Sequence, residues 1–253
     1  MPLVSKGENI NSSYFNGFYK DIWRSFIPDK FTEKEIEFML GYFNLGTGSK
    51  VLDIMCGYGR HAIGLARSGI KVTAVDNLVE YIDEIKQISI NENLDLTSVC
   101  EDIIQYKPVE TFDLAICMGN SLNFFDQEET EILLSRISSQ LNPGGFFFFN
   151  TWSLEEIVVR NFQEKSLSKV GDFTFLTECK YLFHPARIEM DSTITSPDGT
   201  IENKKGVDYI FSVNEMENML ARSGLYLKEN FSTPGKKKFS IGDVRAYIIA
   251  GKA

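Results

Sequence analysis

Cysteine and histidine are scarce in this sequence, and neither is spaced as in a metal site. The four cysteines are Cys56, Cys100, Cys117 and Cys179. No two of them show C-x-x-C spacing, and His61 and His184 are the only histidines. Because metal sites need clustered thiolates and imidazoles, we expect no metal ion. Unpaired thiols on apolar segments are typical of a protein kept in the reducing cytoplasm.

Long apolar segments and a surplus of positive charge are also absent. No apolar run reaches the ~18 residues of a membrane helix, and the first 13 residues lack the apolar core of a secretion signal. The sequence has 35 Asp and Glu residues but 26 Lys and Arg residues, and the resulting formal charge of −9 repels the backbone of nucleic acid. The one basic run, Lys236–Lys238, is expected in a solvated hairpin. The composition therefore predicts a soluble cytoplasmic protein without membrane or nucleic-acid partners.

What the sequence does contain is a strand, a glycine turn, a helix and a second strand within residues 50–76. The chain has 253 residues, 43% of them hydrophobic, which is enough for one globular domain with additions. An apolar run up to Met55 predicts a buried parallel strand, and Gly57 and Gly59 follow where the backbone must turn. Asp76 ends the next apolar run, where a carboxylate can accept both hydroxyls of a ribose. This order of elements predicts a cofactor that contains adenosine.

The charge of Asp53, at the end of the first strand, indicates which cofactor. A carboxylate there would repel the phosphates of a dinucleotide, but it suits the ammonium group of S-adenosylmethionine. Gly57-x-Gly59-x-x-Ala62 also fits the dinucleotide fingerprint, so an NAD-binding oxidoreductase is kept as an alternative.

These residues resemble the class I, Rossmann-like S-adenosylmethionine-dependent methyltransferases over roughly residues 30–253. The first motif of that family corresponds to Asp53-Ile-Met-Cys-Gly57-Tyr-Gly59, and its second acidic residue to Asp76. Met55 departs from the pattern, because the family usually has glycine there, and the departure bears on the local backbone path. The resemblance implies that Asp102 accepts from the adenine amino group while Ile103 lines the ring. It also implies that Met118–Ser121 face the methyl group, and that Leu141–Gly145 lead into the fifth strand.

The predicted site has two sets of residues. Those expected to bind the cofactor are Tyr14, Asp53, Cys56, Gly57, Gly59, Arg60, Asp76, Asn77, Asp102, Ile103 and Met118. Those considered for catalysis are Tyr19, Asn120 and His184. Each has a structural interpretation beside the functional one: the tyrosines could seal a sheet edge, Gly119-Asn120 is a turn dipeptide, and His184 could be a surface imidazole. Arg60 could hold a carboxylate of the substrate or the cofactor, because a positive charge in the first turn of a helix is unfavourable unless it has a specific partner.

Three parts are expected along the chain. Residues 1–45 form an N-terminal helical arm or lid, in which Thr32 and Glu35 predict a capping box. Residues 46–169 and 212–253 form the core, a doubly wound sheet that by resemblance has order 3-2-1-4-5-7-6 with strand 7 antiparallel. Residues 170–211 form an inserted antiparallel β element with extended segments at 173–183, 187–195 and 200–211, which covers the substrate or forms a dimer surface. Ser212 and Glu215 predict a capping box for the helix that follows. The chain is then a monomer or a homodimer.

The expected function is transfer of a methyl group to a small molecule, by in-line displacement, with the accepting atom N, O or C left open. The segment after the fourth strand reads Met118-Gly-Asn-Ser121 and lacks the Pro-Pro-aromatic motif of amino-group DNA methyltransferases. A protein that binds S-adenosylmethionine only to sense it is the second alternative.

Overall fold

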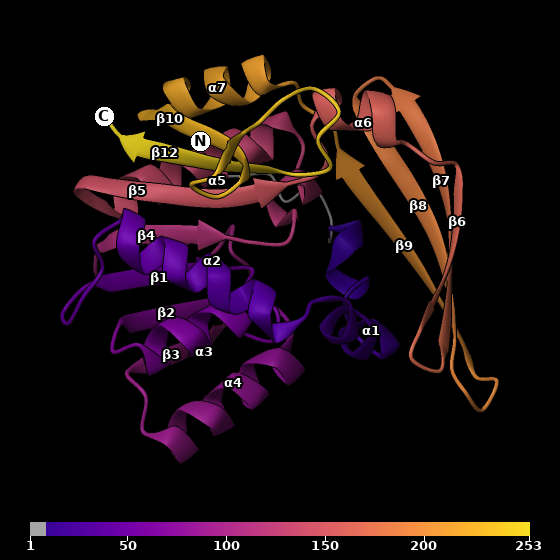
Figure 1. Cartoon of the computed structure of the whole chain (residues 1–253), viewed down its shortest axis with the longest axis horizontal. Helices are drawn as coiled ribbons and strands as arrows, with labels where there is room; N and C mark the ends of the chain where they lie inside the picture. Colours follow the sequence, from indigo (N-terminus) through magenta and orange to yellow (C-terminus); the bar gives the residue numbers. More distant parts are fainter. Residues whose placement is uncertain (1–8) are drawn as a thin grey trace. The chain divides into compact units, whose positions relative to one another are not determined.

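The computed structural model describes residues 9–253, which form two compact units. The larger unit consists of residues 29–161 and 211–253, and the smaller unit combines the N-terminal segment up to Pro28 with residues 162–210 (Figure 1). The arm was expected to end at residue 45 and the insert to begin at residue 170. The structure instead divides the chain at Pro28 and after Asn161. The first eight residues of the expected arm lie outside the described residues.

The larger unit is built on one eight-stranded sheet of order β11-β10-β12-β5-β4-β1-β2-β3. Its strands are β1 (Lys50–Ile54), β2 (Lys71–Asp76), β3 (Leu96–Cys100), β4 (Phe112–Cys117), β5 (Leu141–Thr151), β10 (Leu225–Thr233), β11 (Lys237–Lys238) and β12 (Ala246–Lys252). Strands β1 to β5 pair in parallel, whereas β12 runs antiparallel to both β5 and β10. The predicted fold class and strand order are confirmed, and β11 extends the sheet by the short hairpin that carries the basic run.

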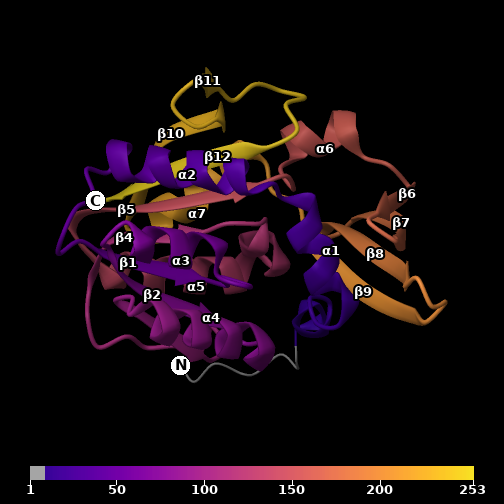
Figure 2. The ribbon, with the colours of Figure 1, turned by 60° about the horizontal axis from the view of Figure 1, so that its bottom comes forward.

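Helices cover both faces of this sheet. They are α2 (Asp29–Tyr42), α3 (Arg60–Arg67), α4 (Val79–Glu92), α5 (Gln127–Gln140), α6 (Glu155–Asn161) and α7 (Val213–Arg222), with the short turn η2 (Ser121–Phe124). Figure 2 shows α2, α3 and α4 on one face, where their apolar side chains share a core with Phe148, Tyr247 and Ile249 of the sheet. Burial on both faces explains why these strands read as continuous apolar runs.

The capping signals had mixed outcomes. Ser212 and Glu215 form the predicted capping box at the start of α7. The box predicted at Thr32 and Glu35 is wrong, because α2 begins three residues earlier, at Asp29. Thr32 therefore lies within the first turns of α2, and Glu35 is 3% exposed instead of capping a helix end.

The smaller unit is a four-stranded antiparallel sheet of order β6-β7-β8-β9. Its strands are β6 (Lys165–Val170), β7 (Phe173–Phe183), β8 (Ala186–Thr195) and β9 (Ile201–Tyr209). The last three match the extended segments expected from the sequence. Strand β6 was not expected, because its residues KSLSKV are mostly polar and five of the six have partly or fully exposed side chains.

The N-terminal segment packs on this four-stranded sheet. It comprises η1 (Ile10–Ser13) and α1 (Phe18–Phe26), and Ile22 of α1 is buried against Val170 and Ile194. The side chain of Asn11 both accepts from the N–H of Val207 and donates to its carbonyl, each at 2.9 Å, as a neighbouring strand would. Phe18 and Tyr19, which are half-buried, pack against the same cluster within this unit. Among residues 9–253, no helix combines the length and apolarity needed to cross a bilayer.

Candidate functional site

The turn after β1 keeps the backbone path that the glycine-rich motif requires, even though one glycine is replaced. Met55 has φ of 51°, in the left-handed region, followed by Gly57 at 56° and Gly59 at 75°. A side chain in this region costs about 1–2 kcal/mol, which explains why glycine is usual at the position of Met55. Strain of this kind is retained where a ligand site depends on the backbone path.

Gly57 and Gly59 have different uses. A Cβ atom on Gly59 would lie 2.6 Å from Ile85, so this glycine lets α3 approach α4. A Cβ atom on Gly57 would meet nothing within 4 Å. The open side of Gly57 is therefore a place where a ligand can lie against the main chain.

Asp53 is a buried carboxylate that the described residues leave partly unsatisfied. It is 2% exposed, and its Oδ2 atom has no hydrogen-bond partner there. Burial raises the pKa of Asp53 to about 7, although the charge of Arg60 and the N–H of Ala62 oppose the shift. Since an unpaired buried carboxylate is costly, this atom is suited to receive a cationic ligand group.

Asp76, at the end of β2, holds the glycine turn in place. Its Oδ2 accepts from the N–H of Gly57 at 2.8 Å, and its Oδ1 accepts from the N–H of Leu78 at 3.0 Å. It is only 8% exposed, more buried than a carboxylate in an open cleft. Burial raises its pKa, against the effect of these backbone hydrogen bonds. The N–H of Asn77 also donates to this carboxylate, which still keeps lone-pair capacity to accept from a hydroxyl group.

The segment after β3 continues this edge of the sheet. Asp102 is exposed, and its Oδ1 accepts from the N–H of Ile104 at 2.7 Å, while Ile103 is 8% exposed. Asn77, directly after β2, is also exposed. The ends of β1, β2 and β3 are adjacent, so Asp53, Asp76 and Asp102 follow one another along the edge.

Cys56 and Met118 mainly pack against the hydrophobic core. The N–H of Cys56 donates to the carbonyl of Val75 at 3.1 Å and so ties the turn to β2. Burial raises the pKa of the Cys56 thiol well above its ordinary value, which keeps it neutral. Met118 is 8% exposed and belongs to the core beneath α2 and α3.

Asn120, considered for catalysis, is completely buried and uses its side chain to hold the end of β5. Its Oδ1 accepts from the Thr151 hydroxyl and from the N–H of Trp152, both at 2.9 Å, and its Nδ2 donates to the Ser153 hydroxyl at 2.8 Å. Its φ of 69° fits the turn interpretation. These contacts indicate that Asn120 positions the backbone beside the site.

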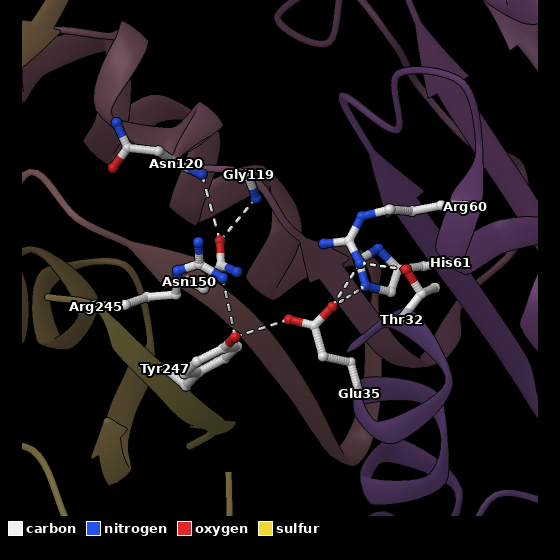
Figure 3. A network of polar contacts seen from close by, with 9 residues as sticks. All are labelled: Thr32, Glu35, Arg60, His61, Gly119, Asn120, Asn150, Arg245 and Tyr247. Atoms are coloured by element: carbon white, nitrogen blue, oxygen red, sulfur yellow. Dashed lines mark hydrogen bonds and ion pairs between the residues drawn. The ribbon is translucent and has the colours of Figure 1, made fainter. Parts of the chain in front are cut away.

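Arg60 has a carboxylate partner, but this carboxylate belongs to the protein and not to a substrate or cofactor. Its Nη1 donates to Glu35 Oε2 at 2.6 Å and to the Thr32 hydroxyl at 2.9 Å (Figure 3). His61 Nε2 also donates to Glu35 Oε2, at 2.8 Å. Burial and the nearby Arg60 charge lower the pKa of His61 to about 4, so this imidazole is neutral at pH 7.

Glu35 joins this group to β12. Its Oε1 accepts from the hydroxyl of Tyr247 at 2.8 Å, and Tyr247 in turn accepts from Arg245 Nη1 at 3.3 Å. Burial would raise the pKa of Glu35, but its hydrogen bonds to His61 and Arg60 and the charge of Arg60 outweigh burial and lower the pKa to about 2. Burial, with the adjacent Glu35 charge, raises the pKa of Tyr247 to about 12. Glu35 is therefore ionised and Tyr247 neutral at pH 7.

Three predicted site residues lie in the smaller unit. Tyr14 is 6% exposed, and its hydroxyl hydrogen-bonds to Ser192 at 2.8 Å. Burial raises the pKa of Tyr14 to about 12. The ring of Tyr19 packs against those of Tyr14 and Phe175. His184 is exposed in the turn between β7 and β8. The structural interpretation thus accounts for the contacts of Tyr14 and for the exposure of His184.

Four residues of the polar network were missed at the sequence level: Glu35, Asn150, Arg245 and Tyr247. Glu35 was assigned to a helix cap, and Asn150 was given no role. Nothing near Arg245 or Tyr247 in the sequence marks them, because their partners lie up to 212 positions away. The unexplained charge of Arg60 was the only local signal for this network.

Several known proteins similar to this chain are methyltransferases. Residues 51–145 match a family described as a methyltransferase domain. A ubiquinone biosynthesis O-methyltransferase of Coxiella burnetii is 31% identical over 49% of this chain. That match spans about half of the relative's own length, 50%.

Solved structures resemble the chain over nearly its whole length. The CcbJ methyltransferase of Streptomyces caelestis has a TM-score of 0.81 at 16% identity and covers 96% of this chain and 99% of its own. A SAM-bound amino pentose methyltransferase of Micromonospora echinaspora has a TM-score of 0.71 at 15% identity, covering 94% of this chain and 98% of its own. At such identities the likeness shows the fold alone.

Proposed function

We propose that this chain, which belongs to the class I, Rossmann-like methyltransferases through its domain at residues 51–145, transfers a methyl group from S-adenosylmethionine to a small molecule. The observation that carries the proposal is Asp53 Oδ2, a buried carboxylate oxygen without a partner among the described residues, next to a glycine turn with an open side.

The residues present fit this cofactor group by group. The Oδ2 atom of Asp53 suits the ammonium of the methionyl part, since a charged donor satisfies a buried carboxylate. The remaining lone pairs of Asp76 suit the two ribose hydroxyls. The exposed carboxylate of Asp102 and the side chain of Ile103 suit the amino group and ring of adenine. A dinucleotide fits poorly, because its phosphates would face the carboxylate of Asp53.

The chemistry requires positioning more than covalent participation by the protein. When bound, S-adenosylmethionine supplies an electrophilic methyl group that an acceptor atom displaces in line. Asp53 would hold the methionyl ammonium and Asp76 the ribose, and Gly57 would admit the cofactor against the main chain. Asn120 and Asn150 fix the backbone at the ends of β4 and β5. His61 is poorly suited to act as a general base, because it is buried and bonded to Glu35, and a pKa lowered to about 4 makes its imidazole a weak base.

The acceptor is a small molecule, and the accepting atom is N, O or C. The smaller unit is proposed to cover the substrate or to form a dimer surface, and the chain to act as a monomer or homodimer. The four cysteines are unpaired, which supports the cytoplasm as its compartment.

Calorimetry with S-adenosylmethionine, its demethylated product and NAD tests the cofactor assignment. We expect binding of both sulfur ligands and none of NAD; binding of NAD alone would contradict the proposal and favour an oxidoreductase. Incubation with methyl-labelled cofactor and a cell metabolite extract should then label a small molecule. Tight cofactor binding without labelling in any extract would favour the sensor alternative.

A further inference from the structure

Asn150, near the end of β5, carries a buried donor without a partner. Its Oδ1 accepts from the backbone N–H groups of Gly119 at 2.7 Å and Asn120 at 3.3 Å. These two bonds fix which way the amide points. The side chain is 1% exposed, yet Nδ2 has no hydrogen-bond acceptor among the described residues. A buried amide N–H of this kind is costly unless a ligand completes it.

Arg245 presents more donors on the same face of the sheet. Asn150 and Tyr247 are direct register partners of β5 and β12, and Arg245 precedes Tyr247 by two positions, so the three side chains share one face (Figure 3). The Arg245 guanidinium lies 5.3 Å from the ring centres of both Phe31 and Trp152. Two aromatic rings and the Tyr247 hydroxyl therefore hold the guanidinium in a defined position.

The charge of Arg245 is not balanced by its neighbours. Among the described residues, no carboxylate forms an ion pair with it. Glu35 lies on the other side of Tyr247, but Arg60 is paired with it at 2.6 Å. Among residues 9–253, the Tyr247 hydroxyl is the one hydrogen-bond acceptor for the five N–H groups of Arg245. A planar monoanion with two acceptor oxygens would satisfy both the guanidinium and the Asn150 amide.

We propose that Arg245 and Asn150 bind a carboxylate group of the methyl acceptor, so that the substrates are small carboxylic acids. This inference rests on the proposed function. Arg245 directly precedes β12, which is antiparallel to β5, so it lies at the sheet edge where β1, β4 and β5 end. That is the edge at which ligands bind in open α/β sheets.

The position of Arg245 and Asn150 along the sheet edge indicates that the carboxylate they bind belongs to the methyl acceptor and not to the cofactor. In the order β1-β4-β5-β12, three strand spacings of about 4.8 Å, or about 14 Å, separate β1 from β12. The carboxylate of S-adenosylmethionine is attached to the same carbon as its ammonium, which Asp53 on β1 is proposed to hold. A group tied so closely to β1 is poorly placed for β12, whereas an acceptor lying over β4 and β5 is well placed.

The experiment uses the full chain, methyl-labelled cofactor and a cell metabolite extract. We expect the labelled product to be retained on an anion exchanger at pH 7 and released at about pH 2.5, where carboxylates are protonated and phosphates are not. Arg245→Gln and Asn150→Asp should each lower the labelling rate about 10- to 100-fold at unchanged cofactor affinity, the range for losing a charged hydrogen bond. Asn150→Asp retains the acceptor for Gly119 and Asn120, so its fold should persist. Arg222→Gln, which removes an exposed arginine of α7, is the matched control and should leave the rate unchanged.

A second readout does not depend on turnover. With the demethylated cofactor bound, benzoate should raise the melting temperature more than benzamide does, and Arg245→Gln should abolish the difference. Equal shifts for acid and amide, or a labelled product that is not a carboxylic acid, would overturn the proposal. A loss of cofactor affinity in Arg245→Gln that equals the loss of rate would also overturn it, because the carboxylate would then be the cofactor's own. An acid-specific shift without labelling in any extract would support the site and contradict the proposed function alone.

Discussion

Within the larger unit, the ends of β1 and β2 carry buried hydrogen-bond acceptors. The end of β5 and the residue before β12 carry hydrogen-bond donors. Asp53 and Asp76 occupy the first pair of ends, and Asn150 and Arg245 occupy the second. Each pair includes one buried polar atom without a partner: Asp53 Oδ2 in the first and Asn150 Nδ2 in the second.

Between these two pairs of strand ends lies the hydrogen-bonded network of Glu35, whose two carboxylate oxygens both have partners. Both oxygens of Glu35 accept hydrogen bonds, from Arg60, His61 and Tyr247. A buried polar group without a partner destabilises the fold, so its persistence at both ends points to ligand binding, whereas the satisfied network between them has a structural role. The difference can be tested because substitutions should have opposite effects at the two kinds of site. Those at the strand ends should weaken ligand binding, whereas those in the Glu35 network should lower the stability of the fold.

The largest effect is expected at Glu35. Glu35→Gln removes a charge that is 3% exposed and leaves Arg60, whose side chain is 11% exposed, without its ion-pair partner, so the free energy of unfolding should fall by about 3–5 kcal/mol. Urea unfolding measures this change. Glu92→Gln is the matched control, because Glu92 pairs with Arg67 at the same 2.6 Å but at the surface. Equal losses in the two variants would contradict a structural role for the buried network.

Asp53→Asn should separate binding from stability. Losing the charged acceptor should weaken binding of S-adenosylmethionine by about 2 kcal/mol, whereas the free energy of unfolding without cofactor should not fall. Asp76→Ala should weaken binding by a similar 1.5–3 kcal/mol, as roughly expected for a charged hydrogen-bond partner. Calorimetry and urea unfolding give the two quantities, and Asp83→Asn on the exposed side of α4 is the control. Wild-type affinity in Asp53→Asn would remove this residue from the site.

The pKa of Asp53 predicts a pH dependence of about 1.4 kcal/mol per unit. With a pKa raised to about 7, the carboxyl is protonated below pH 7, so cofactor affinity should fall about tenfold per pH unit between pH 7 and pH 5.5. The unfolded chain loses this proton near pH 4, so Asp53 makes the cofactor-free protein less stable as pH rises from about 4 to 7. Titrations at several pH values test this, and the dependence should be flat in Asp53→Asn.

The smallest effect is expected at Met55, which lies between Asp53 of β1 and the glycine turn. Met55→Gly relieves the left-handed strain but loses side-chain contacts, while Met55→Ala loses the contacts and keeps the strain. The glycine variant should therefore be more stable than the alanine variant by about 1 kcal/mol. Thermal unfolding of the pair measures it, and a more stable alanine variant would show that the turn is not strained.

Much of the larger unit follows from local patterns. The apolar runs ending at Asp53 and Asp76, with glycines between them, predicted β1, α3 and β2, and the capping box at Ser212 marked the start of α7. Such signals succeed because helix caps, turns and strand alternation depend on near neighbours. Strand β6 was missed because an exposed edge strand need not be apolar.

The sequence by itself thus determined the fold class, the acidic residues at the ends of β1 and β2 and the kind of cofactor they suit. Only the tertiary structure decided that Glu35 is a buried ion-pair partner and not a cap, that the arm packs on the four-stranded sheet, and that Arg245 shares a face with Asn150. The physical reason is that burial and the partner of a polar group are set by contacts between distant segments. A carboxylate or guanidinium has the same local sequence signature whether it is exposed, paired or left to bind a ligand.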